Sequence, residues 1–160
     1  NKATELLAWD QAKKLPWGLL LLFGGGLSLA SAIVSTGLAG WLGSSLSFLA
    51  NAPIAIILLV IILAIVLLTE ITSNTATTVT FLPIAAAVAV SVGANQYLLT
   101  LAVVLSASCA FMLPVATPPN AVIFGSGKLD IKHMIRAGLL INIAGIVIIG
   151  SMLYVLVPQF

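Results

Sequence analysis

Two short polar segments interrupt long apolar stretches of this chain, and their side chains could do chemistry. The first, residues 73–75, reads Ser-Asn-Thr, and the second, residues 117–120, reads Thr-Pro-Pro-Asn. Both supply hydroxyl and amide oxygens, and no Lys, Arg or His lies among them. Small hard cations such as sodium prefer several oxygen ligands, including backbone carbonyls that become free where a helix unwinds. The two segments therefore indicate a site for a small cation.

Each polar segment also precedes an expected helix, and the two helix N-termini would point at the same place. Unpaired amide groups at a helix N-terminus bind anions, above all carboxylates. A single polar break often only caps a turn or bonds a neighbouring helix. Two breaks in one short chain are a stronger signal, and they indicate a joint site for a cation and a carboxylate.

The remaining reactive side chains give weaker signals. Glu70 is either a functional carboxylate near the cation or a structural group bonded to hairpin amides, and we favour the structural role. His133 lies among basic residues and suits the membrane interface better than a proton relay. Ser73 has no His or Asp nearby in sequence, so we expect no covalent catalysis and no enzyme. Cys109 is the one cysteine and suits a membrane helix.

The charged residues are confined to a few places. Of 160 residues, 61% are hydrophobic and 6% are charged, with a mean hydropathy of +1.26. All charges except Glu70 lie within residues 2–14 or 128–136. Residues 15–127 could not form a water-exposed surface, which excludes a soluble enzyme, a nucleic-acid binder and a disordered tail. The composition predicts an all-α integral membrane protein.

Helix length divides the chain into five segments, since a bilayer core of about 30 Å takes about 20 helical residues to cross. Residues 1–14 suit an amphipathic cytoplasmic helix at the membrane interface. Residues 15–52 comprise a transmembrane helix to about residue 37 and an external connection. The final segment, residues 137–160, holds the last transmembrane helix.

The segment 53–92 predicts a re-entrant hairpin with residues 73–75 at its tip. Its apolar limbs, residues 53–68 and 79–92, would reach about 25 and about 21 Å, less than the core thickness. Two full spans remain an alternative, because both arrangements return the chain to the same side. Polar backbone at mid-membrane depth is tolerated only where it is buried in protein or lines a cavity.

The segment 93–136 predicts a broken transmembrane helix and a cytoplasmic loop. Residues 96–127 are too long for one straight span, and they contain Pro114, Pro118 and Pro119. A proline removes an amide donor and disfavours α geometry in the residue before it. We therefore expect two half-helices joined by an unwound stretch at residues 115–120.

The basic residues orient the chain, because they lie only within residues 2–14 and 128–136. The positive-inside rule makes both loops cytoplasmic, in the plasma membrane of a bacterium. The chain starts at Asn1 with a polar stretch, without an initiator methionine or a signal peptide. A transporter of this hydrophobicity normally needs more spans, so we expect a further N-terminal portion.

A resemblance to the divalent anion/sodium symporter family is carried by two motifs, residues 69–84 (TEITSNTATTVTFLPI) and 112–127 (MLPVATPPNAVIFGSG). Residues 13–30 and 134–146 support it, so it covers essentially the whole chain. The family includes bacterial and mammalian sodium-coupled dicarboxylate and citrate carriers. The resemblance implies the C-terminal one of two inverted repeats, each with a re-entrant hairpin and a broken helix, in a homodimer. The N-terminal repeat would supply the first Ser-Asn-Thr motif, which is absent here.

The resemblance also implies roles for individual residues at the substrate. Ser73, Asn74 and Thr75 would form the second Ser-Asn-Thr motif, in which Asn74 and Thr75 contact a substrate carboxylate. Thr117 and Pro118 in the broken helix would close the substrate site.

Sodium is the co-transported ion that the resemblance implies. One ion would lie among Thr69, Ser73, Asn74 and the backbone near Ala116. The residues themselves support this role for sodium, because no Lys or Arg lies near mid-membrane to neutralise a dianion. A dianion in a low-dielectric site needs compensating charge. We therefore expect sodium to bind first and to order the two tips.

The expected function is import of C4-dicarboxylates such as succinate, malate or fumarate, or of related divalent anions, by sodium-coupled alternating access. A sodium-independent exchanger or a proton-coupled carrier of the same fold is an alternative, and Glu70 is the only local titratable group for proton coupling. A channel with a re-entrant filter and a purely structural membrane subunit are further alternatives. The sequence does not choose among these anions, citrate and sulfate.

Overall fold

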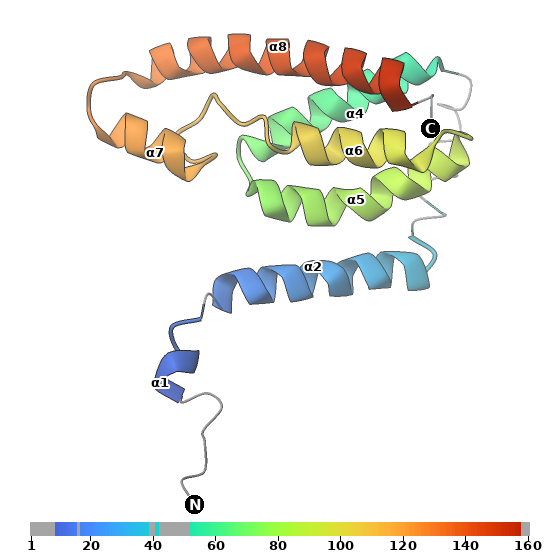
Figure 1. Ribbon diagram of the computed structural model, residues 1–160, viewed down its shortest axis with the longest axis horizontal. Helices are drawn as coiled ribbons and strands as arrows, with labels where there is room; N and C mark the ends of the chain where they lie inside the picture. Colours follow the sequence, from blue (N-terminus) through green and yellow to red (C-terminus); the bar gives the residue numbers. More distant parts are fainter. Residues whose placement is uncertain (1–8, 16, 39–40, 42–51, 158–160) are drawn as a thin grey trace, which may run out of the picture.

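The computed structural model describes residues 9–15, 17–38, 41 and 52–157, and every regular element of this part of the chain is a helix. In chain order the helices are α1 (Trp9–Ala12), α2 (Trp17–Ser35), α4 (Ile54–Thr69), α5 (Asn74–Ser91), α6 (Gln96–Ser106), α7 (Pro118–Gly125) and α8 (Ile131–Leu156). Figure 1 shows α4, α5, α6 and α8 side by side, with α2 beside α5. The prediction of an all-α fold is confirmed.

Helices α4 and α5 form a hairpin whose turn, residues 70–73, is shorter than the sequence predicts. The second limb begins at Asn74 and not at residue 79, and the threonine hydroxyls of this stretch bond to one another or to a helical carbonyl. Thr78 Oγ1 donates to the Asn74 carbonyl at 2.8 Å, and the hydroxyls of Thr72 and Thr77 lie 2.6 Å apart. With 18 residues α5 is about 27 Å long, so the predicted short second limb is wrong.

The interruption between α6 and α7 starts earlier than the sequence predicts. Residues 107–117 are not helical, whereas Pro118 and Pro119 form the first turn of α7. Proline suits this position, since an amide there would have no helical acceptor. The predicted unwound stretch at residues 115–120 is therefore wrong at its C-terminal end, and the true one is longer.

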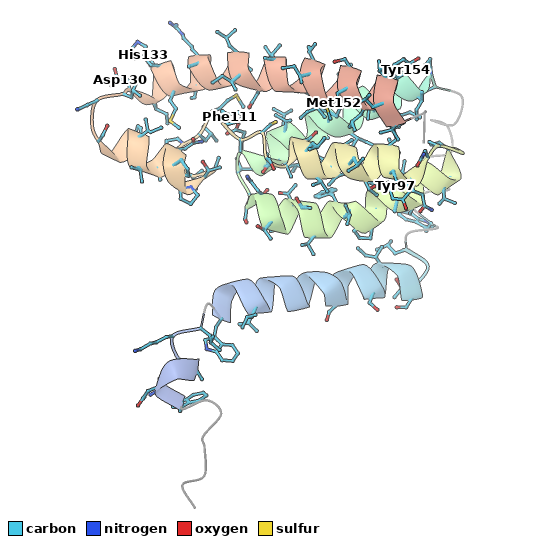
Figure 2. The ribbon with its side chains drawn as sticks, in the orientation of Figure 1. Tyr97, Phe111, Asp130, His133, Met152 and Tyr154 are labelled. Carbon is cyan, nitrogen blue, oxygen red and sulfur yellow. The ribbon has the colours of Figure 1, made fainter. Side chains whose placement is uncertain are left out.

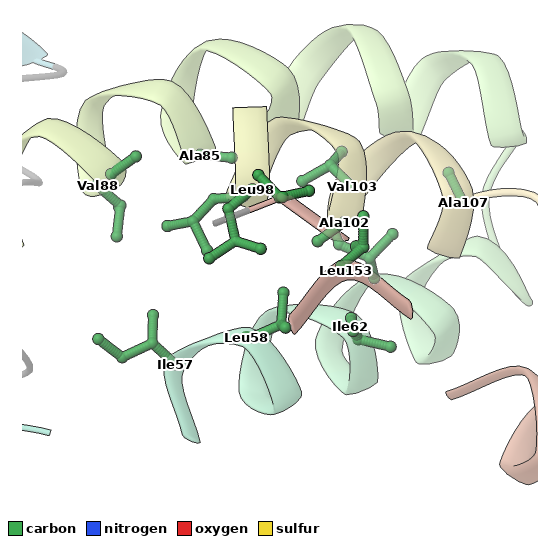
Figure 3. Close-up of a cluster of buried hydrophobic side chains, with 14 of the residues drawn as sticks. Ile57, Leu58, Ile62, Ala85, Val88, Leu98, Ala102, Val103, Ala107 and Leu153 are labelled. Atoms are coloured by element: carbon green, nitrogen blue, oxygen red, sulfur yellow. The ribbon is translucent and has the colours of Figure 1, made fainter. Parts of the chain in front are cut away.

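The buried core lies around α6, which contacts α4, α5 and α8 (Figure 3). Leu99 and Ala102 of α6 are fully buried, as are Ile62 of α4 and Ala89 of α5. The outer faces of the same helices are also apolar, and Leu140 and Val147 of α8 are largely exposed. Helices that are apolar all round are typical of membrane spans or of contact with further protein.

By length and composition, α5 and α8 could cross a membrane, while α4 and α6 are shorter apolar helices. Helix α2 agrees with the expected first transmembrane helix in position. Of the expected interfacial helix at residues 1–14, only Trp9–Ala12 is helical within the described residues. The external connection before residue 52 lies mostly outside the described part of the chain.

Basic residues and the open end of the hairpin lie at opposite ends of α8. Figure 2 shows Asp130 and His133 at its start, and Tyr154 and Tyr97 at the other end. A cavity of about 280 Å³ lies at that other end, and the residues that line it include Ala52, Val92, Asn95 and Val157. The hairpin limbs, the start of α6 and the end of α8 therefore meet at one end, and the hairpin tip points away from it.

Candidate functional site

Three oxygens converge where the hairpin tip meets the end of α6. Thr69 is the last residue of α4 and is fully buried. Its Oγ1 lies 2.7 Å from Asn74 Oδ1 and 2.8 Å from the carbonyl oxygen of Ala107. A hydroxyl has one proton and so cannot serve both acceptors fully. This cluster is electron-rich and suits a cation ligated by oxygens.

The N-terminus of α5 opens at the hairpin tip. Ser73 is its N-cap residue, but the Ser73 side chain makes no capping hydrogen bond. The first helical hydrogen bond runs from Thr77 N to the Ser73 carbonyl at 2.8 Å, so the amides of residues 74–76 have no helical acceptor. Thr75 is half-buried in this first turn. These amides and hydroxyls could bind a carboxylate.

The N-terminus of α7 does not offer the amides that the sequence predicts. Pro118 and Pro119 have no N–H group, and Asn120 N bonds to the hydroxyl of the N-cap residue Thr117 at 3.4 Å. The next amide, that of Ala121, bonds to the Thr117 carbonyl at 3.1 Å. The expectation that two helix N-termini present amides to a carboxylate is wrong for α7. Its first two residues have no N–H group, and the Thr117 hydroxyl already accepts from the third.

The residues expected from the broken helix lie at the C-terminal end of the unwound segment, residues 107–117, and at the start of α7. Ala116 is buried and its amide donates to the Leu113 carbonyl at 3.2 Å, whereas Pro118 is exposed. Among the described residues no hydrogen bond joins Asn74 to Ala116, Thr117 or Pro118. The structure thus brings Thr69 and Asn74 together and links Thr117 to them only indirectly.

Asn120 supplies that indirect link. This side chain is buried, and its Nδ2 donates to the carbonyls of Ala110 at 2.9 Å and Leu113 at 3.0 Å. The first turn of α7 therefore folds back onto the unwound segment. The sequence identified Asn120 as a polar residue of the break, but it gave no sign that this side chain would bond backbone ten positions earlier.

Glu70 has partners that the sequence did not reveal. It is almost fully buried, and its carboxylate accepts hydrogen bonds from the amides of Phe111, Met112 and Leu113 at 2.9 to 3.1 Å. Asn142 Nδ2 of α8 donates to the same carboxylate at 2.7 Å. We expected a structural Glu70 to bond hairpin amides, but the amides come from the unwound segment. Asn142 was missed, although it is a lone amide within the apolar run of α8.

Helix α8 lies directly against the unwound segment. A Cβ added at Gly138 would lie 2.5 Å from the Phe111 carbonyl carbon and 2.6 Å from Met112 Cα. These are backbone atoms, so only a glycine allows this approach. One helical turn away from Asn142, a Cβ at Gly145 would meet Cys109 Sγ at 3.2 Å. One face of α8 thus packs against the unwound segment, at the backbone beside Gly138 and at the Cys109 side chain beside Gly145.

The similarity to known proteins extends over the regions described above. A sequence model described as the sodium:sulfate symporter transmembrane region matches residues 3–156. The chain is 48% identical over 158 residues to the sodium-dependent dicarboxylate transporter SdcS of Staphylococcus saprophyticus. It is 50% identical over 158 residues to SdcS of a Staphylococcus aureus strain.

These matches cover 99% of this chain but 30% of each relative, so the chain spans less than a third of their length. The matched region includes both polar segments and all the described helices from α1 to α8. The resemblance inferred from the two motifs is confirmed. The chain belongs to the sodium:sulfate symporter family of integral membrane transporters.

Proposed function

We propose that this chain is part of a plasma-membrane transporter that imports C4-dicarboxylates or related divalent anions together with sodium. The observation that carries this proposal is the oxygen cluster of Thr69, Asn74 and Ala107 beside the free N-terminus of α5. The SdcS relatives, whose names describe sodium-dependent dicarboxylate transporters, support the substrate class.

Charge balance supports a role for sodium. Glu70 is the only charged residue in residues 15–127, and it is negative. Two opposite charges about 4 Å apart attract by several kcal/mol at the effective dielectric of a protein, so bound cations can offset the cost of desolvating a dianion. Sodium therefore binds first, and the dicarboxylate follows.

The site residues divide between the two ligands. Thr69, Ser73 and Asn74 hold one sodium ion with the carbonyls of Ala107 and of the backbone near Ala116. Asn74 and Thr75, with Ser73 and the open amides of α5, hold one substrate carboxylate.

Thr117, the last residue of the unwound segment, and Pro118, the first residue of α7, close the substrate site. The second carboxylate and further sodium ligands come from the N-terminal repeat of the same protein, and two copies assemble as a homodimer.

The hairpin is re-entrant in this proposal, and residues 53–92 form it. Tip depth, and not limb length, now supports this arrangement, since Glu70 bonds to Asn142 near the middle of α8. The last span begins at residue 137, so Asn142 lies about 8 Å inside the membrane from the cytoplasmic side, and a tip at this depth does not cross the core. Residues 93–136 form the broken helix and the cytoplasmic loop, and residues 137–160 the last span.

Proton coupling is the main alternative, and the Glu70 contacts argue against it. Five contacts from N–H groups reach its two oxygens, which fills their acceptor capacity. A carboxyl group held in this way has no free oxygen for a transported proton. A sodium-independent exchanger lacks the cation that the tip oxygens would bind.

Uptake by the full-length transporter in proteoliposomes tests the proposed function. An inward sodium gradient should drive saturable accumulation of radiolabelled succinate, and a proton gradient without sodium should not. Single-channel currents, or equal uptake with choline in place of sodium, would refute sodium-coupled carriage.

A further inference from the structure

The Glu70 carboxylate joins three separate parts of the fold. It belongs to the hairpin turn, it accepts from three consecutive amides of the unwound segment, and it accepts from Asn142 of α8. Its side chain is 2% exposed, and Asn142 is equally buried. Hydrogen bonds to a buried charged acceptor are stronger than those between two neutral groups.

These contacts replace the hydrogen bonds that a continuous helix would have made. In a helix, the amides of Phe111, Met112 and Leu113 would donate to carbonyls four residues earlier. Here all three donate to Glu70, at distances of 2.9 to 3.1 Å. The chain can leave helical geometry at this depth only because a carboxylate accepts from these partly buried amides.

Asn142 is oriented by the same carboxylate. Its Nδ2 donates to Glu70 Oε1, while its buried Oδ1 has no partner in the described part of the chain. An unpaired buried oxygen is costly, so the Nδ2 contact must outweigh that cost. On the same face of α8, Gly138 leaves space for the backbone of Phe111 and Met112.

The position of the cation ligands depends on this arrangement. Thr69 precedes Glu70 in the chain, and Thr69 Oγ1 lies 2.8 Å from the Ala107 carbonyl, at the start of the unwound segment. Glu70 holds residues 111–113 against the hairpin turn. The Ala107 carbonyl lies four residues before Phe111, so it is held in place against Thr69 and Asn74 as well. Glu70 itself has no free lone pair for a cation.

We propose that Glu70, supported by Asn142, is a positioning residue that holds the unwound segment against the hairpin tip and so sets the sodium-binding geometry before any ion binds. This inference rests on the proposed function. Glu70 acts through Thr69, Asn74 and Ala107, and it touches neither sodium nor the dicarboxylate.

Kinetics of three variants of the full-length transporter test this role. Glu70→Gln keeps one acceptor oxygen but turns an amide group toward backbone amides, so two donors face each other. It should raise the sodium concentration at half-maximal succinate uptake about tenfold or more, which corresponds to about 1.4 kcal/mol. Glu70→Asp keeps the charge on a shorter arm and should give a smaller rise. Asn142→Ala removes one contact and should give a rise of about threefold.

Two further measurements separate positioning from a merely structural role. The sodium constant is the sodium concentration at half-maximal succinate uptake. The succinate KM at saturating sodium should change less than this constant, because bound sodium restores the geometry of its oxygen ligands. Sodium should also raise the Tm of purified wild-type protein more strongly than that of Glu70→Gln at the same sodium concentration. If Glu70→Gln does not fold, Glu70→Asp and Asn142→Ala decide the question by the same sodium constant.

An unchanged sodium constant in folded variants, with only a lower Tm, would overturn the inference while leaving the proposed function intact. Sodium-independent uptake by the wild-type protein would instead overturn the proposed function. Thr100→Ala is the matched control, because this half-buried hydroxyl bonds only to helix backbone, and it should leave the sodium constant unchanged.

Discussion

At the level of single residues, Thr69 is the side chain on which the proposed cation site depends most directly. Its one hydroxyl lies between the Asn74 amide oxygen and the Ala107 carbonyl oxygen, which come from different elements. One hydroxyl proton cannot serve both acceptors fully, so the cluster keeps oxygen lone pairs that a cation could use.

Replacing Thr69 with Ala should raise the half-saturating sodium concentration by about tenfold, since one ligand is lost and two buried oxygens lose their donor. Thr69→Ser keeps the hydroxyl and should stay within about threefold of wild type. Sodium titration of succinate uptake measures both values. Equal sodium constants for Thr69→Ala and wild type would remove Thr69 from the site.

The Ser-Asn-Thr motif should carry the substrate contact. Asn74→Ala removes an amide that faces Thr69 and lies at the first helical position of α5. We expect uptake of succinate to fall by about tenfold or more at saturating sodium, because the carboxylate site and the cation site share this residue. Unaltered sodium-dependent uptake by Asn74→Ala would contradict this assignment.

The polar segment at residues 73–75 and the family resemblance predicted part of the candidate site's geometry. Thr69, Ser73 and Asn74 lie within one short polar stretch, so their proximity follows from local sequence, and the structure places them at the turn. The contact between Glu70 and Asn142 spans 72 positions, and that between Asn120 and Ala110 depends on a backfolded segment. No local sequence pattern predicts these contacts, because only the tertiary fold brings the partners together.

At the level of elements, the helix break shows what prolines do and do not determine. Pro118 and Pro119 predict an interruption near their own position, and α7 does begin at Pro118. The upstream end lies after Ser106, where no proline occurs. There the helix ends because Thr69 bonds to the Ala107 carbonyl and Glu70 takes the amides of residues 111–113, so tertiary partners replace helical ones.

The contact between α8 and the unwound segment depends on Gly138. In Gly138→Ala the new methyl group would overlap the backbone of Phe111 and Met112, which cannot move without breaking the Glu70 contacts. We expect the Tm to fall clearly, with a cost of about 2 kcal/mol or more. Gly125→Ala is the matched control, because nothing lies within 4 Å of its added Cβ. Similar Tm values for both variants would contradict close packing at Gly138.

At the level of the whole molecule, the distribution of charge along α8 determines the expected orientation. Lys128, Lys132 and Arg136 lie at or before its first turns, and the open end of the hairpin lies at its other end. The positive-inside rule then makes the hairpin enter from outside the cell.

Labelling of single cysteines tests this orientation in cells. Lys132→Cys should react with a membrane-impermeant thiol reagent only after the membrane is opened, whereas Gln96→Cys, at the exposed start of α6, should react in intact cells. Both side chains are exposed in the structure. The reversed labelling pattern would overturn the topology.

The chain corresponds to 30% of the length of its relatives, and the proposed function makes the described site one half of a binding site for a dianion. It offers one open helix N-terminus and one oxygen cluster, which suit one carboxylate and one cation. A second carboxylate needs a second set of ligands from outside this chain.

Calorimetric binding of succinate to the full-length transporter, at several sodium concentrations and constant ionic strength, tests the central claim that sodium provides the positive charge for the dianion. Below saturation, the succinate Kd should fall by about tenfold or more for each tenfold rise in sodium, since the two affinities are linked reciprocally. A succinate Kd that stays the same when choline replaces all the sodium would contradict the account.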